Sequence, residues 1–143
     1  MTKSLLAVLA DYLIVPLLFI PVVLWARHDP RTALRVTLSG LLASWLTWGI
    51  KNYFYLPRPF ILTGTPPAID FLLDGSFPSG HTALSLGLSF ALFPRYPKWA
   101  ILFISISFFI GVARVLAGVH TPADVLGAIL VGLFSAIATR QRH

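Results

Sequence analysis

The chain has 143 residues, of which 57% are hydrophobic and 11% are charged, and its mean hydropathy is +0.81. Soluble domains are about 45–50% apolar and about 25% charged, so this composition excludes an ordinary soluble domain and indicates one membrane-embedded domain, residues 1–143. The absence of cysteine excludes disulfides and thiolate metal sites. The net charge of +6 does not indicate a nucleic-acid partner, because the basic residues lie between apolar runs and not in one patch.

The first candidate membrane span is the apolar run Leu5–Ala26, which Asp11, Pro16 and Pro21 interrupt. A basic residue, Lys3, precedes it, as in a signal peptide. The apolar stretch is long for a signal-peptide core, however, and no A-x-A-like cleavage site follows it. We therefore expect this segment to be retained as part of the protein.

The second apolar run, about Ala33–Tyr55, is long enough to cross a bilayer, since about 20 apolar residues span a hydrocarbon core of about 30 Å. Its middle, Val36–Ile50, carries no charge. A stretch rich in proline and glycine, Pro57–Gly75, follows it. Proline does not sustain the backbone hydrogen bonds of a helix, so this stretch is predicted to be a loop.

Three further apolar runs follow the loop, at Ser79–Phe93, about Pro97–Leu116 and Pro122–Thr139. The run Ser79–Phe93 is short for a full span. Together, the five runs predict an all-α fold, an integral membrane bundle of about five transmembrane helices.

The distribution of lysine and arginine predicts the orientation of the bundle, because cytoplasmic loops carry more of them than external loops. With five spans, the first connection, the third connection and the segment after the last span share one side. These places hold Arg27, Arg31, Arg35, Arg95, Lys98, Arg140 and Arg142. We therefore expect a multi-pass protein of the cytoplasmic membrane, with its N-terminus outside and its C-terminus in the cytoplasm. The outer side then holds only Lys3, Lys51, Arg58 and Arg114.

Six ionisable residues are predicted to gather near the outer membrane face, at the ends of the apolar runs. They are Lys51, Arg58, His81, Arg114, His120 and Asp124. A charged residue inside a membrane segment costs about 2.5–3.5 kcal/mol on insertion scales, so such a cluster indicates a functional site. Three cations and two histidines that converge point to an anionic ligand.

Each of these residues, taken alone, also has a purely structural explanation. Lys51 and Arg58 are suited to anchor a helix end at the interface. Ser79, next to a proline, is suited to cap a helix, and the T-P-A-D sequence at 121–124 has the pattern of a capping box. His120 alone is compatible with an interfacial ring that makes one hydrogen bond.

The structural explanations do not account for the joint placement of these residues. A helix that begins near Ser79 presents free N–H groups and the positive end of its dipole, which suits phosphate, and Gly80 lets an anion approach the backbone closely. With two histidines nearby, one imidazole can attack phosphorus while the other protonates the leaving oxygen. Asp124, four residues after His120, is placed to hold the other nitrogen of that ring and to fix its tautomer.

Three sequence blocks resemble the signature of the type 2 phosphatidic acid phosphatase family, which includes vanadium haloperoxidases and glucose-6-phosphatase. They are K-x6-R-P at Lys51–Pro59, P-S-G-H at Pro78–His81, and R-x5-H-x3-D at Arg114–Asp124. The order and internal spacing of all three blocks match, and the signature covers residues 51–124, about half of the chain.

The resemblance implies a role for each matching residue. His120 would be the nucleophile that forms a phosphohistidine, Asp124 would orient it, and His81 would be the general acid for the leaving group. The residues that would bind the phosphate and stabilise its charge are Lys51, Arg58, Ser79, Gly80 and Arg114. The resemblance implies no metal and no other cofactor, and Asp70 and Asp74 in the outer loop are too few for a two-metal site.

Two features depart from the family pattern. Ala113 stands where the family usually has serine before the arginine of the third block, but that serine is not among the catalytic groups. Bacterial lipid phosphatases of this family commonly have six spans, whereas this chain has five apolar runs. We therefore expect a leading helix to be absent while the core bundle remains.

A site at the outer membrane face suits a substrate whose phosphate lies at the headgroup level while its tail stays in the lipid. The resemblance implies undecaprenyl diphosphate as the substrate, because short bacterial members are often assigned that role. Phosphatidylglycerophosphate and phosphatidic acid remain alternatives, since no residue of the sequence indicates which lipid tail is bound.

Two other classes of function are less compatible with the residues. A non-enzymatic anion transporter would not need both histidines together with Asp124, and haloperoxidases are mostly soluble. The oligomeric state is not indicated by the sequence.

Overall fold

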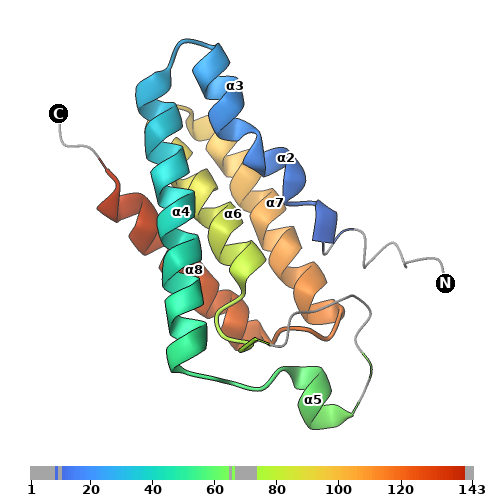
Figure 1. Ribbon diagram of the computed structural model, residues 1–143. Coiled ribbons are helices and arrows are strands. Elements are labelled where there is room, and N and C mark those ends of the chain that lie inside the picture. The colour runs from blue at the N-terminus through green and yellow to red at the C-terminus, as the bar shows by residue number, and fades with distance from the viewer. Residues whose placement is uncertain (1–8, 10, 65, 67–73, 141–143) are drawn as a thin grey trace.

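The computed structural model describes residues 9, 11–64, 66 and 74–140, and the regular structure in these residues is helical throughout (Figure 1). The helices are α2 (Val15–Leu18), α3 (Ile20–Ala26), α4 (Pro30–Tyr53), α5 (Pro59–Thr63), α6 (Gly80–Leu92), α7 (Pro97–Leu116) and α8 (Pro122–Ala138). The prediction of an all-α fold is confirmed. Four residues named above, Lys3, Leu5, Asp70 and Arg142, lie outside the described residues.

Three of the four longest helices, α4, α7 and α8, begin with a proline, and two of these also have a side-chain cap. The Asp29 carboxylate accepts a hydrogen bond from the Thr32 N–H at 3.2 Å, so α4 starts at Pro30, earlier than the apolar pattern predicts. At the start of α8, Thr121 and Asp124 form the predicted capping box. The bounds of α7 agree with the predicted run.

Two segments differ from the prediction. The first apolar run is not one helix but breaks at Phe19, because Pro16 and Pro21 each lie in the first turn of a separate short helix, α2 and α3. The prediction of an uninterrupted loop after α4 was wrong, because α5 lies within it. Pro59 takes the first position of α5, where its missing N–H is not needed, and Gly64 ends the helix with a left-handed φ of 69°.

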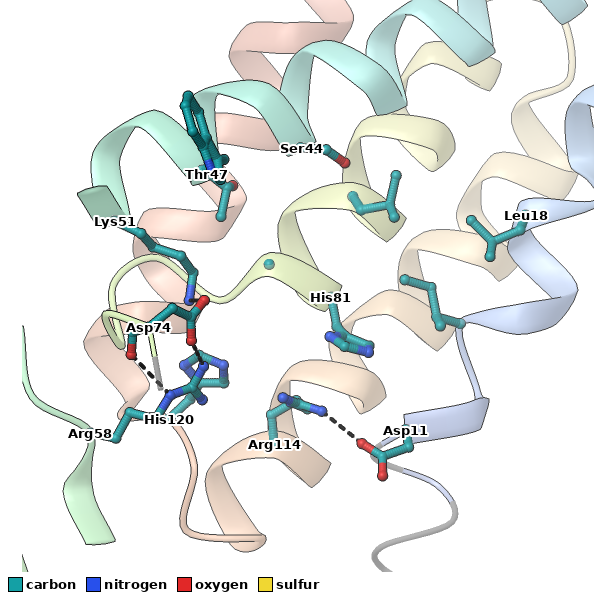
Figure 2. Close-up of a pocket in the computed structure, with 14 residues that line it drawn as sticks. Asp11, Leu18, Ser44, Thr47, Lys51, Arg58, Asp74, His81, Arg114 and His120 are labelled. Atoms are coloured by element: carbon teal, nitrogen blue, oxygen red, sulfur yellow. Dashed lines mark hydrogen bonds and ion pairs between the residues drawn. The ribbon is translucent and has the colours of Figure 1, made fainter. Parts of the chain in front are cut away.

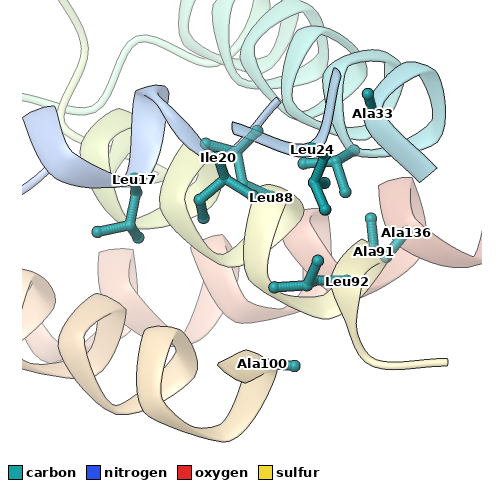
Figure 3. Packing of buried hydrophobic residues seen from close by; sticks show 10 residues of the cluster. Leu17, Ile20, Leu24, Ala33, Leu88, Ala91, Leu92, Ala100 and Ala136 are labelled. Carbon is teal, nitrogen blue, oxygen red and sulfur yellow. The ribbon is translucent and has the colours of Figure 1, made fainter. Parts of the chain in front are cut away.

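Helix α6 lies at the centre of the bundle, and α4, α7 and α8 surround it (Figure 1). Nine of its 13 residues are buried. One core cluster, which extends toward the end of α6, includes Leu17 of α2 and Ile20 of α3 together with Leu88 and Leu92 of α6 (Figure 3). The run Ser79–Phe93, which is short for a full membrane span, therefore forms a helix that is buried inside the bundle.

Two glycines allow α4 and α8 to approach α6 closely. A Cβ atom at Gly87 of α6 would lie 3.1 Å from the carbonyl oxygen of Ser39 in α4, and the Ser39 hydroxyl donates a hydrogen bond to the Gly87 carbonyl at 2.7 Å. A Cβ atom at Gly132 of α8 would lie 2.8 Å from the Leu86 Cβ and 3.0 Å from the Gly87 nitrogen. Backbone contacts this close leave no room for a side chain.

The outer faces of the bundle are apolar. Large exposed side chains cover the outside of α4, α7 and α8, among them Trp45, Trp48, Phe108, Phe109, Leu130 and Phe134. Of the described helices, α7 is long and apolar enough to cross a membrane, while the segment Val15–Ala26 and α8 are shorter apolar helices. The number of spans and the orientation of the termini stay predictions.

The α3–α4 and α6–α7 corners lie at the same end of the bundle, and these corners and the first turns of α4 and α7 hold four of the seven predicted cytoplasmic charges, Arg27, Arg31, Arg95 and Lys98. The Tyr96 hydroxyl in the second corner donates a hydrogen bond to the Asp29 carboxylate in the first at 3.0 Å. The opposite end brings together the end of α4, the start of α6, the end of α7 and the start of α8 (Figure 1). The predicted site residues come from this opposite end.

Replacing Gly132 by alanine should lower the free energy of unfolding by about 1–3 kcal/mol, because the added methyl group meets the backbone of α6. The matched control is Gly49→Ala in α4, where a Cβ atom has no described atom within 4 Å and alanine is the better helix former. Thermal unfolding of both variants in detergent measures the difference. An equal change in melting temperature for the two variants would contradict the close-packing argument.

Candidate active site

A cavity of about 610 Å³ opens at the end of the bundle where α6 begins (Figure 2). Its polar part is lined by side chains from α4, α6, α7 and the connections between the helices. Its apolar part is formed by Ile14, Leu18, Trp48 and Leu84. A polar pocket next to an apolar wall suits a ligand with an ionic head and an apolar tail.

The structure brings six of the eight predicted site residues to this cavity. They are Lys51 in the last turn of α4, Arg58 before α5, Gly80 and His81 at the start of α6, Arg114 in the last turn of α7, and His120 before α8. The other two, Ser79 and Asp124, are buried beside the cavity and do not line it.

The His120 imidazole is held by the carboxylate of Asp124. The His120 Nδ1 atom lies 3.3 Å from the Asp124 Oδ2 atom, and both residues are 3% exposed. The same carboxylate accepts hydrogen bonds from the Thr121 N–H at 2.7 Å and from the Ser76 hydroxyl. Because Nδ1 is hydrogen-bonded to Asp124, Nε2 is the ring nitrogen that is available to react with a ligand.

Asp124 therefore has both of the roles that the T-P-A-D sequence suggested, a structural one at the helix start and one at the site. It completes the capping box of α8 with Thr121, and it also holds His120. Its backbone carbonyl accepts a hydrogen bond from the Ser79 N–H at 3.0 Å, which fixes the start of α6 against the start of α8.

Ser79 occupies the N-cap position of α6, but its side chain makes no capping hydrogen bond. The Ser79 hydroxyl lies 2.9 Å from the Thr82 hydroxyl instead and is fully buried. The hydroxyl does not face the cavity, so its role as a phosphate ligand stays a prediction. Gly80, the next residue, does line the cavity.

Each of the three cations in the cavity is paired with a carboxylate (Figure 2). The Lys51 Nζ atom lies 3.1 Å from the Asp74 Oδ2 atom, and Arg58 binds the other oxygen of the same carboxylate. On another side of the cavity, the Arg114 Nη1 atom lies 2.9 Å from the Asp11 Oδ1 atom. Two carboxylates thus leave one positive charge in excess.

The roles of Asp11 and Asp74 were not predicted from the sequence. Asp11 stood out there only as an interruption of an apolar run, and Asp74 only as a candidate metal ligand. An isolated carboxylate in an apolar run needs a cationic partner, and this signal could have suggested the pairing.

The loop residues of the site have shifted pKa values. Burial raises the pKa of Asp74, but the hydrogen bonds from Arg58 and Lys51 outweigh this effect and hold it below its usual range. Burial lowers the pKa of His120, its hydrogen bond with Asp124 opposes this, and the nearby cations lower it further. Together, these effects place the pKa of His120 below that of a free imidazole, so the ring is neutral at neutral pH.

Two polar atoms of the cavity residues lack a partner. Among the described residues, three buried side-chain nitrogen or oxygen atoms make no hydrogen bond. Two of them, the Thr47 Oγ1 atom and the Arg114 Nε atom, belong to residues that line the cavity. Buried polar atoms are normally hydrogen-bonded, so these two are exceptions, and both belong to residues in the wall of the cavity.

The chain is similar in sequence to a known family and to proteins of known function. A family model described as "PAP2 superfamily" matches residues 32–143, which confirms the resemblance found in the three sequence blocks. Undecaprenyl-diphosphatase BcrC of Bacillus subtilis (strain 168) is 27% identical over 133 residues, which cover 91% of this chain and 69% of that protein. A lipid A 1-phosphatase of Rhizobium etli is 32% identical over 109 residues, which cover 73% of this chain and 45% of that protein.

The fold also resembles a solved structure. The crystal structure of Aquifex aeolicus LpxE superposes with a TM-score of 0.76 at 28% sequence identity, and the match covers 94% of this chain and 80% of that chain. The chain is shorter than these relatives and spans about two thirds or less of the length of most curated proteins that it matches.

Replacing Asp124 by alanine should lower the free energy of unfolding by at least about 2 kcal/mol, because buried donors of Ser76 and Thr121 lose their acceptor. Thr121→Ala removes only the hydrogen bond that the Thr121 hydroxyl accepts from the Asp124 N–H, and it should cost about 1 kcal/mol. Thermal unfolding in detergent compares the two variants. If they cost the same, the helix cap alone explains the stabilising role of Asp124.

Proposed function

Because the chain belongs to the PAP2 superfamily, we propose that it is a membrane phosphatase that removes the terminal phosphate of a lipid phosphate or diphosphate. The observation that carries the proposal is the cavity that joins two histidines and three cations to an apolar wall, with a carboxylate behind His120.

We propose His120 as the nucleophile. Its Nε2 atom attacks phosphorus while Asp124 holds the Nδ1–H. A bond forms between Nε2 and phosphorus, the bond from phosphorus to the leaving oxygen breaks, and His81 gives a proton to that oxygen. Water then attacks phosphorus and gives a proton to His81, the bond from phosphorus to Nε2 breaks, and inorganic phosphate leaves.

The cations stabilise the charge that develops on the transferred phosphoryl group. Lys51, Arg58 and Arg114 face the cavity together with Gly80 at the positive end of α6. When the phosphate of the substrate binds, it replaces Asp74 and Asp11 as the ion-pair partner of these cations.

The substrate that we propose is undecaprenyl diphosphate. The apolar wall of the cavity supports a lipid substrate, and the relative from Bacillus subtilis supports a polyprenyl diphosphate. Phosphatidylglycerophosphate and phosphatidic acid are the alternative substrates, and a non-enzymatic anion transporter is the alternative class. We propose that the protein crosses the cytoplasmic membrane five times, with its N-terminus and active site outside and its C-terminus inside.

His120→Ala should lower the rate of phosphate release by at least about 1000-fold, because the nucleophile is lost. The assay uses purified protein in detergent with a lipid diphosphate and EDTA, so it also tests the expectation that no metal ion is needed. His28→Ala is the matched control, because His28 is exposed in the α3–α4 connection. Full activity of the His120 variant would contradict the phosphohistidine mechanism, and an inactive wild-type protein would favour the transporter.

The acid limb of kcat/KM should lie below pH 6.5, the approximate pKa of free imidazole, because His120 must be neutral to attack and its pKa is lowered. Asp124→Asn replaces the carboxylate that raises the pKa of His120 by a neutral amide, so the limb should move to still lower pH while the rate falls. The pH profiles of the two proteins measure this. Movement of the limb to higher pH in the variant would contradict the assignment.

A further inference from the structure

Thr47 is buried in the wall of the cavity, and its hydroxyl makes no hydrogen bond with any described residue. The side chain is 4% exposed. A threonine inside a helix usually bonds to the carbonyl four residues earlier, as Thr37 of the same helix does with Ala33 at 2.8 Å. Thr47 forgoes this bond, although a buried hydroxyl without a partner is costly. A ligand in the cavity would supply the missing hydrogen-bond partner of this hydroxyl.

The position of Thr47 identifies the part of the ligand that it faces. Thr47 lies one turn before Lys51 on the same face of α4, about 6 Å farther from the end of the helix. Opposite it is the start of α6, since a Cβ atom at Gly80 would lie 3.7 Å from the Thr47 Cγ2 atom. One turn farther along α6 is Leu84, part of the apolar wall. Thr47 thus lies between the cations and the apolar wall.

We propose that the Thr47 hydroxyl binds the part of the headgroup that stays on the lipid when phosphate is released, and that it favours diphosphates over monophosphates. This inference rests on the proposed function. With the transferred phosphoryl group at His120 and the cations, the group at the level of Thr47 is the next one toward the tail. In a diphosphate that group is a second phosphoryl, whose charged oxygens accept a hydrogen bond from the hydroxyl.

A lipid monophosphate places different atoms at this level. Its ester oxygen is followed directly by carbon, so it offers the hydroxyl one uncharged acceptor in place of several charged ones. Losing the hydroxyl should therefore affect the two substrates unequally. A purely structural role of Thr47 would affect them equally.

The test compares a polyprenyl diphosphate with the monophosphate of the same tail, using the full chain in detergent. Thr47→Val, which keeps the shape and removes the hydroxyl, should lower kcat/KM about 10-fold for the diphosphate and less than about 2-fold for the monophosphate. Thr47→Ser should restore most of the diphosphate activity. Thr37→Val is the matched control in the same helix, and its substrate preference should equal that of the wild-type protein.

Thermal unfolding of the Thr47→Val variant separates binding from folding, because removal of an unpaired buried hydroxyl should leave the melting temperature unchanged or raise it. An equal loss of activity on both substrates, or no loss on the diphosphate, would overturn the inference while the proposed function stands. A wild-type protein that hydrolyses neither substrate would overturn the proposed function and this inference with it.

Discussion

The hydrogen bonds of the Asp124 carboxylate hold together the parts of the protein that form the site. This one side chain accepts hydrogen bonds from the Ser76 hydroxyl, in the segment before α6, and from the Thr121 N–H, at the start of α8. It also orients His120. The Ser79 N–H binds the Asp124 carbonyl, so the start of α6 is fixed as well. A buried carboxylate with this many donors stays ionised without an ion-pair partner, so none of the three cations is needed to neutralise it, and all three line the cavity, where Asp74 and Asp11 pair with them.

The close packing around α6 gives this arrangement its precision. Gly87 and Gly132 bring the backbones of α4 and α8 to within contact of α6, so Lys51 of α4 and Asp124 of α8 have fixed positions relative to His81. Catalysis by positioned groups depends on such rigidity, because a misplacement of about 1 Å already costs about 100-fold in rate. The small residues of the bundle therefore serve the site as much as the stability of the fold.

The sequence predicted the helices and the convergent residues well, because both leave local signals. Apolar runs bounded by proline located α4, α6, α7 and α8, and three spaced blocks located the cavity residues. The α5 helix was missed because a proline that breaks a helix in its interior is favourable at its first position. The partners of the cations were missed because Asp11 and Asp74 lie far along the chain from Arg114 and Lys51, and pairing over such distances is decided only by tertiary packing.

The pairing of the cations with carboxylates has a consequence for turnover. A cavity with three uncompensated positive charges in a medium of low dielectric constant would hold inorganic phosphate tightly, and product release would then limit the rate. Here Asp74 and Asp11 act as built-in counterions. In the proposed mechanism, binding is an exchange of one anion for another, and the returning carboxylates help to expel the product. Such a site binds the transition state strongly and is not inhibited by the phosphate that the proposed reaction releases.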